Sequence, residues 1–83
     1  MVEVEFYYND IKTIIQCNLN DKIKDIYQNY LNKINEDKNN IYFSYNGIAG
    51  NNFNEELTFQ EMINSEDKKR NKMNILVFKN EIE

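Results

Sequence analysis

Few side chains in this sequence could do chemistry, and Cys17 is the first candidate because a thiol can act as a nucleophile. Histidine is absent from the 83 residues, so no imidazole can take the proton of a nucleophile and histidine-based triads are excluded. Cys17 occupies an inward position of a predicted strand, opposite Val2, where a free cysteine packs as a small hydrophobe. We therefore expect a buried thiol and a protein that is not an enzyme.

Charged clusters are the other candidates for a site. The acidic pairs Glu55-Glu56 and Glu66-Asp67 are not set in an oxygen-rich loop of the kind that binds a cation. The basic cluster consists of Lys68, Lys69, Arg70 and Lys72. It follows an acidic pair and contains no aromatic residue to stack on bases, and the net charge of −4 opposes binding to phosphate backbones. We expect solvated loops, no metal or other cofactor, no nucleic-acid partner and no small-molecule substrate.

The size and composition of the chain indicate one small domain. A single cysteine cannot form an internal disulfide, and no apolar leader follows Met1, which together favour a cytoplasmic or nuclear protein over a secreted one. The longest apolar run, from Ile75 to Phe78, is too short to span a membrane. We expect a single domain over residues 1–83, with a core at about 2–78 and a polar tail at 79–83, and no membrane partner.

The stretch from Asp21 to Ile34 organises the chain, because its apolar residues recur with helical spacing. The six apolar residues of this stripe are Ile23, Ile26, Tyr27, Tyr30, Leu31 and Ile34. A helix with one apolar stripe is stable only when the stripe packs on another element. The flanking segments alternate like strands, so the pattern predicts one long helix on a sheet, with Asn20 or Asp21 capping the start of the helix.

Two strands are predicted before the helix. Apolar and polar residues alternate from residue 2 to residue 8, which is typical of a half-buried strand. Asn9-Asp10 follows, and both residue types tolerate the positive φ of a tight hairpin turn. A register that places Val2 opposite Cys17 makes every large inward residue of one strand meet an inward residue of the other. The sequence therefore predicts a hairpin in this register.

The second half of the chain contains shorter elements. The pattern predicts a strand at Ile41–Tyr45, a turn at Asn46-Gly47 and a brief return strand at Ile48-Ala49. A helical turn should open with a capping box at Thr58 and Glu61 and run to Met62 or Ile63. The last strand is predicted at Met73–Phe78. We expect Phe53 and Leu57 to close the underside of the core. Residues 64–72 are polar, and we expect a loop there.

This order of elements resembles the β-grasp of the ubiquitin-like domain family. The segments that carry the resemblance are Thr13–Ile23, Ile41–Gly47, Glu56–Thr58 and Met73–Val77. The resemblance extends from about residue 2 to residue 78 and implies an α+β fold of the ββαββ type, with one long helix packed on a mixed sheet. In ubiquitin a terminal Gly-Gly is conjugated to lysine, whereas this sequence ends with Phe78–Glu83. The resemblance therefore implies a non-conjugated type.

A non-conjugated ubiquitin-like domain is a recognition module, and many stand at the start of a longer protein. The resemblance thus implies a non-catalytic interaction domain, excised from or N-terminal in a larger protein. Its partner would be a protein, such as a receptor for the ubiquitin fold or a helical motif. The alternative is a small structural subunit that stays buried in a larger assembly.

The candidate partner-binding site is the sheet face turned away from the helix. Strand parity turns five apolar side chains to this face, namely Tyr7, Ile14, Tyr42, Leu76 and Phe78. By resemblance, the family's main binding positions on the third and last strands fall on Tyr42 and Leu76, with Asn74 beside them. The first hairpin carries no leucine at its tip, unlike ubiquitin. We therefore expect an interaction face centred on Tyr42 and Leu76.

Overall fold

The computed structural model describes residues 1–45, 47–50 and 56–80, and for 48–50 only the main chain. In order along the chain, the elements are β1 (Val2–Tyr8), β2 (Ile11–Cys17), α1 (Ile23–Ile34), β3 (Ile41–Tyr45), β4 (Ile48–Gly50), α2 (Phe59–Met62), α3 (Ser65–Arg70) and β5 (Lys72–Lys79). The strands form one sheet in the order β2-β1-β5-β3-β4. None of the helices formed by these residues has the length and apolar composition needed to cross a membrane.

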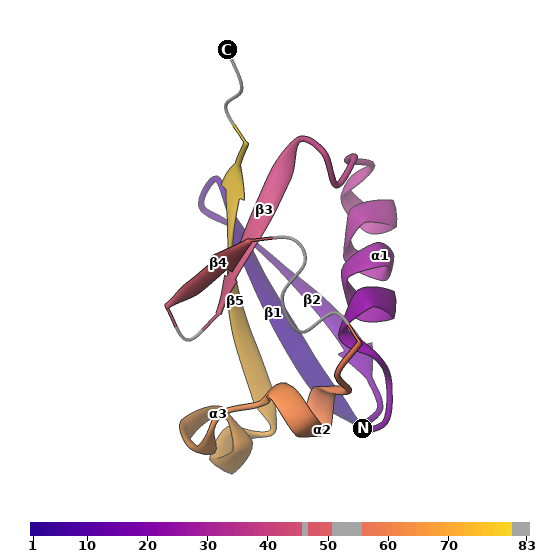
Figure 1. Ribbon diagram of the computed structural model, residues 1–83, viewed down its shortest axis with the longest axis vertical. Helices are drawn as coiled ribbons and strands as arrows, with labels where there is room; N and C mark the ends of the chain where they lie inside the picture. The colour runs from indigo at the N-terminus through magenta and orange to yellow at the C-terminus, as the bar shows by residue number, and fades with distance from the viewer. Residues whose placement is uncertain (46, 51–55, 81–83) are drawn as a thin grey trace.

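The sheet is mixed, because β1 and β5 run parallel while the other neighbouring strands run antiparallel. Helix α1 packs on one face of this sheet, and β1 and β5 lie between β2 and β3 (Figure 1). Helices α2 and α3 follow one another at the end of the molecule opposite the last residues of β5 (Figure 1). The predicted α+β, β-grasp fold with one long helix on a mixed sheet is confirmed.

The first hairpin has the predicted register. Val2 pairs with Cys17, and Tyr8 pairs with Ile11. The two turn residues both adopt left-handed conformations, with φ of 51° at Asn9 and 64° at Asp10. Two left-handed residues form the turn that matches the natural twist of paired strands. The prediction of a tight Asn-Asp turn is therefore confirmed.

An aromatic cluster fills the space between α1 and the sheet. The ring of Phe6 stacks on Tyr30 at 4.1 Å between centroids, and Tyr27 stacks on Phe43 at 3.9 Å. The predicted helix stripe is buried except at its last member, Ile34, which is half-buried against the core. Offset stacking of buried rings adds to the hydrophobic gain, so this cluster holds the helix on the sheet.

The predicted cap of α1 was wrong. The residue at the cap position is Lys22, and its side chain makes no capping hydrogen bond. The carboxylate of Asp21 instead accepts a hydrogen bond from the Asn18 N–H at 2.8 Å. The Ile23 N–H donates to the Leu57 carbonyl at 2.8 Å. A neighbouring segment thus satisfies the start of the helix, which local sequence could not indicate.

Outside residues 64–72, the elements after β3 agree with the prediction where they are described. The Thr58 and Glu61 side chains form a reciprocal capping box at the start of α2. Leu57 packs, partly buried, against the core. Gly47 has a φ of +78°, as a turn requires, and β4 is the predicted return strand. The predictions for Asn46, Phe53 and the tail residues 81–83 concern residues outside those that the structure describes.

The predicted polar loop at residues 64–72 was also wrong, because most of it forms α3. Asn64 caps this helix by accepting a hydrogen bond from the Asp67 N–H at 2.7 Å. Asp67 is buried, although its sequence neighbours are exposed. A six-residue helix without an apolar stripe leaves no periodic signal, so only its contacts with other elements reveal it.

Candidate functional site

The outer face of the sheet, which we define as the face away from α1, carries the predicted site residues. The cross-strand register arranges them in rows. Leu76 lies beside Tyr7 of β1 on one side and Ser44 of β3 on the other. Phe78, two residues further along β5, lies opposite Tyr42 of β3. Neighbouring positions in such a row have side chains close enough to interact.

Three apolar side chains meet at one corner of the outer face, and we call Tyr42, Leu76 and Phe78 the apolar corner. The rings of Tyr42 and Phe78 stack with centroids 5.3 Å apart and an interplanar angle of 25°. Leu76 is 49% exposed and Phe78 is 42% exposed. Large apolar side chains that stay this exposed next to one another form a surface that a partner can cover with a gain in free energy.

The other predicted site residues lie at increasing distance from the apolar corner. Tyr7 is the direct neighbour of Leu76 on β1. Asn74 and Ile14 share a row with Glu5, and Ile14 is on the outer strand β2, with β1 between it and β5. The structure therefore brings Tyr7 to the apolar corner, while Asn74 and Ile14 lie at the margin of the face.

Glu5 occupies the middle of the outer face and is almost fully buried, with 6% exposed. The Tyr7 hydroxyl donates a 2.8 Å hydrogen bond to its carboxylate, and the ammonium groups of Lys72 and Lys12 lie 3.5 Å and 4.0 Å away. The hydrogen bond from Tyr7, assisted by both lysines, lowers the pKa of Glu5 despite the opposing effect of burial. The same hydrogen bond raises the pKa of Tyr7.

Strand parity placed Glu5 on the outer face but did not indicate that it would be covered. The strand register could have indicated that Glu5 is covered. Lys12 pairs with Tyr7 and Lys72 pairs with Glu3, so both lysines lie diagonal to Glu5. The result is a fixed polar centre beside the apolar corner. It orients the Tyr7 ring, because the hydroxyl is held by the carboxylate two residues away.

A second polar cluster surrounds the buried Asp67 and attaches α3 to the sheet. The Tyr45 hydroxyl donates a 2.7 Å hydrogen bond to the Asp67 carboxylate, which also accepts from the Asn74 N–H at 3.3 Å and from the Arg70 guanidinium. Burial is the main cause that raises the pKa of Tyr45. Since these bonds reach both β3 and β5, the cluster fixes the end of the outer face where Asn74 lies.

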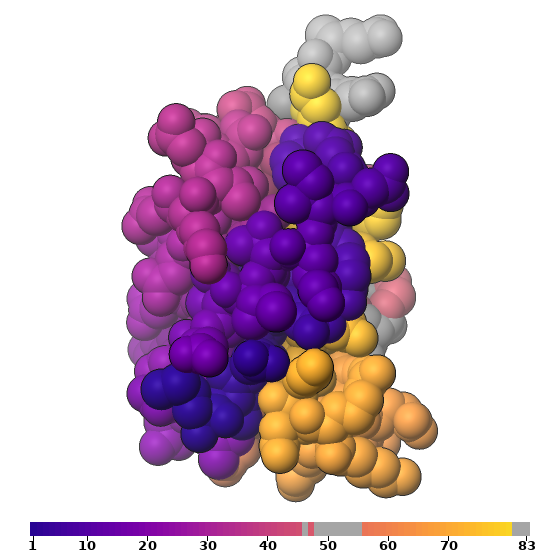
Figure 2. Space-filling view, turned by 180° about the vertical axis from the view of Figure 1, so that it is seen from behind, coloured from indigo at the N-terminus to yellow at the C-terminus, as the bar shows by residue number. Residues whose placement is uncertain are grey.

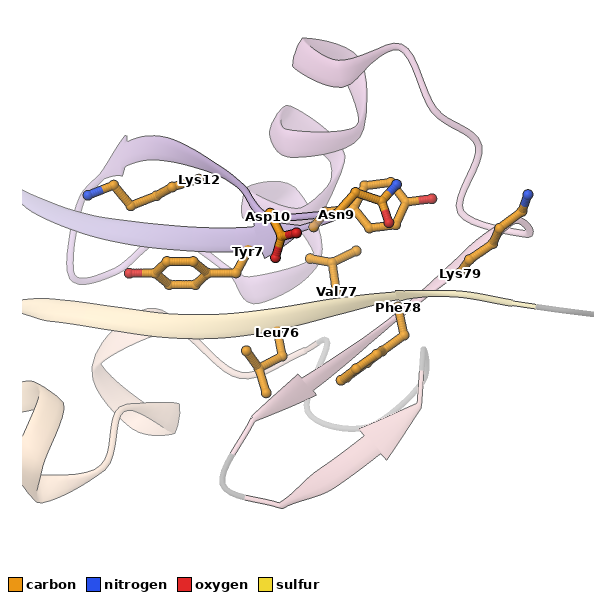
Figure 3. A pocket seen from close by; sticks show the side chains of 9 residues that line it. Tyr7, Asn9, Asp10, Lys12, Leu76, Val77, Phe78 and Lys79 are labelled. Atoms are coloured by element: carbon orange, nitrogen blue, oxygen red, sulfur yellow. The ribbon is translucent and has the colours of Figure 1, made fainter.

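A groove of about 740 Å³ adjoins the apolar corner between the tip of the first hairpin and the end of β5. Its lining residues are Tyr7, Tyr8, Asn9, Asp10, Lys12, Leu76, Val77, Phe78 and Lys79 (Figure 3). Figure 2 shows the tip of the hairpin and the yellow end of β5 at the same end of the molecule, away from the orange helices. The sequence did not indicate this groove, because it depends on where β1 stops relative to β5.

Cys17 is buried, as predicted. Burial, with a smaller contribution from the nearby Asp21 carboxylate, raises the pKa of the Cys17 thiol to about 11. The thiolate is the reactive form of cysteine, so this environment makes Cys17 a poor nucleophile at neutral pH.

Comparisons with known proteins give a fold but no family. No family profile and no curated protein matches the sequence. A chain in the crystal structure of ATBAG1 in complex with HSP70 is similar with a TM-score of 0.71 and 7% identity, covering 99% of this chain and 42% of that one. This chain thus spans less than half the length of that neighbour.

A second solved structure is similar over nearly the full length of both chains. It is a ubiquitin-like protein from the hyperthermophilic archaea Caldiarchaeum subterraneum, with a TM-score of 0.51 and 6% identity. The match covers 98% of this chain and 96% of that one. Likeness at such low identity concerns the fold alone. Together with the strand order, it shows that this chain has a ubiquitin-like, β-grasp fold.

Proposed function

We propose that this chain is a non-catalytic protein-interaction domain that docks a protein partner through the outer face of its sheet. The contact is centred on the apolar corner, with Tyr7 beside it and with Asn74 and Ile14 at its margin. One observation carries the proposal. The Tyr42–Phe78 stack and the half-exposed Leu76 form an apolar surface on the side that α1 does not cover.

The architecture of this face resembles that of a small binding surface. Aromatic and aliphatic anchors at its core are bordered by polar groups, here the Glu5 cluster with Lys12 and Lys72. Complete burial of an anchor side chain contributes about 1.5–3 kcal/mol. Two or three such anchors contribute about 3–9 kcal/mol before the cost of association, so we expect an affinity no tighter than the order of micromolar.

The structural neighbours support a protein as the partner without specifying which one. A similar fold occurs in an archaeal ubiquitin-like protein and in a chain of the crystal structure of ATBAG1 in complex with HSP70. Within our proposal, the partner presents a receptor surface for the ubiquitin fold or a helical motif. A cytoplasmic or nuclear location remains part of the same proposal, as does a place in the ubiquitin pathway.

The test measures the affinity of a purified partner for variants of the apolar corner by calorimetry. Each of Tyr42→Ala and Leu76→Ala removes one anchor, and we expect a loss of roughly tenfold or more in affinity. Leu19→Ala is the matched control, because Leu19 is 47% exposed but does not belong to the outer face. Unchanged affinity in both corner variants would reject this site.

A further inference from the structure

One wall of the groove at the hairpin tip is the edge of a strand. The pairing between β1 and β5 ends at Tyr7 and Leu76. Strand β5 continues to Lys79, and on its other side it stays paired with β3 up to the Ile41–Lys79 pair. Among the described residues, no strand therefore pairs with β5 on the β1 side after Leu76.

The direction of the main-chain groups follows from the neighbouring hydrogen bonds. The Asn80 N–H donates to the Asn40 carbonyl at 2.7 Å, on the β3 side. Main-chain groups of successive strand residues point to alternate sides, so those of Lys79 point to the β1 side. The Asn71 carbonyl accepts a hydrogen bond from the Glu3 N–H of β1, so it points to the β1 side. Lys79 lies an even number of residues further along, and its main-chain groups point to the same side. We call Val77–Lys79 the open edge of β5.

The side chains around the open edge are largely apolar. Leu76 and Phe78 stand on the outer face, and Val77 projects to the opposite side, toward the first hairpin (Figure 3). Both residues of the hairpin turn, Asn9 and Asp10, are held in left-handed conformations. This turn directs the chain back into β2 and leaves the edge beyond it open.

The lining of the groove carries one acidic side chain, Asp10, and two basic ones, Lys12 and Lys79. Asp10 is exposed and makes no ion pair among the described residues. The Lys12 ammonium is directed to Glu5, at 4.0 Å. Lys79 lies near Glu36, whose pKa is lowered chiefly by hydrogen bonds from Asn40 and the Asp37 main chain and further by this lysine. A basic side chain of an occupant would therefore complement the groove at Asp10.

We infer that the groove binds an extended segment of a partner protein, which adds as a short strand to the open edge of β5. The segment places an apolar side chain against Phe78 and a lysine or arginine beside Asp10. Main-chain hydrogen bonds supply affinity in this mode, and the alternating side chains supply specificity. The inference rests on the proposed docking function and deepens it by naming the chemistry of the partner.

The experiment titrates the isotope-labelled protein with three peptides and follows its main-chain amide signals. The first is acetyl-Val-Arg-Val-Arg-Val-amide, the second has glutamate in place of arginine, and the third is the arginine peptide with all of its main-chain nitrogens methylated. We expect the first to shift the signals of Asp10 and of the open edge of β5. The glutamate peptide should not shift them, and methylation, which removes edge-pairing donors, should weaken binding about tenfold.

Protein variants test the charge. Asp10→Asn keeps a residue that tolerates the left-handed turn, and we expect it to weaken binding of the arginine peptide roughly threefold. Asp25→Asn, an exposed position on α1, is the matched control and should leave binding unchanged. Equal shifts with the arginine and glutamate peptides, or no shift at the open edge of β5, would overturn the inference.

The same variants separate this inference from the docking proposal. Tyr42 belongs to the apolar corner but not to the lining of the groove. Suppose that Tyr42→Ala weakens binding of the partner, that Asp10→Asn does not, and that the groove binds none of the peptides. This result would support the docking face and would overturn only the inference that the groove binds an extended segment. Insensitivity of the partner to Tyr42→Ala would instead reject the docking face itself.

Discussion

The Tyr45 hydroxyl donates a 2.7 Å hydrogen bond to the buried carboxylate of Asp67, and this bond joins the end of β3 to α3. The same carboxylate accepts from the main chain of β5 at Asn74 and from Arg70. A charged acceptor is held in the interior only when several donors satisfy it. The cluster therefore ties a polar helix to the sheet without any apolar stripe.

Removal of the Tyr45 hydroxyl should destabilise the domain. Tyr45→Phe keeps the buried ring but takes one donor from the Asp67 carboxylate, and we expect the free energy of unfolding to fall by about 1–3 kcal/mol in chemical denaturation. Tyr42→Phe is the matched control at a half-exposed tyrosine, with an expected change within about 0.5 kcal/mol. If both substitutions lowered the free energy of unfolding equally, the Tyr45–Asp67 hydrogen bond would make no measurable contribution to stability.

Glu5 should make stability depend on pH on the acid side. Its pKa is below the ordinary 4.5, chiefly because of the Tyr7 hydrogen bond. The ionised carboxylate therefore stabilises the folded state at pH values above the ordinary pKa of 4.5. This stabilisation is lost as the pH falls through the lower pKa that Glu5 has in the folded state. Urea denaturation across acidic pH should show a shallower decline for Glu5→Gln than for the wild type. Tyr7→Phe should reproduce part of this change, and identical acid profiles would contradict it.

Truncation of two adjacent residues of β5 should lower the free energy of unfolding by very different amounts. Ile75 is fully buried, so Ile75→Ala should lower the free energy of unfolding by about 2–5 kcal/mol. Leu76 is half-exposed on the outer face, and Leu76→Ala should cost no more than roughly 0.5–1 kcal/mol. Thermal and chemical denaturation measure both values. A large loss of free energy of unfolding for Leu76→Ala would mean that the Leu76 side chain supports the fold. The binding test would then need a different substitution at this position, one that leaves the fold stable.

The Cys17 thiol should react slowly in the folded protein. Burial raises its pKa to about 11, so little thiolate exists near neutral pH and reagents have poor access. A chromogenic disulfide reagent should label Cys17 much faster in denaturant than in buffer. Equal labelling rates in the two conditions would show an accessible thiol and reopen the question of its reactivity.

The oligomeric state of the isolated domain separates transient docking from permanent assembly. A docking module is expected to be a monomer over a wide concentration range in analytical ultracentrifugation, because the apolar corner is small and bordered by charges. A structural subunit whose outer face is always buried should associate or precipitate as its concentration rises. Association that disappears with Leu76→Ala would favour the structural subunit.

The sequence predicted much of the fold because the relevant signals are local. Alternation over seven residues and a tight turn determine the first hairpin, including the Val2–Cys17 pair. The helical stripe from Ile23 and the capping box at Thr58 depend on residues three or four positions apart. Parity likewise placed Tyr42 and Leu76 on the face away from α1.

The pairing of these residues across strands was decided by tertiary structure. Parity turns Tyr42 and Leu76 to one face but does not say which neighbours they meet. The register between β3 and β5 sets Tyr42 against Phe78 and Leu76 against Ser44. Register between strands far apart in the chain depends on how the whole core packs.

Which polar groups are buried, and where the groove lies, also required the tertiary structure. Asp67 is covered because Tyr45, 22 residues away, reaches its carboxylate. Glu5 is covered by lysines from two different strands, and the open edge of β5 exists because β1 turns back after Tyr8. Local composition determines which segments form helices and strands, whereas the solvation of each side chain depends on distant segments that only the folded chain brings together.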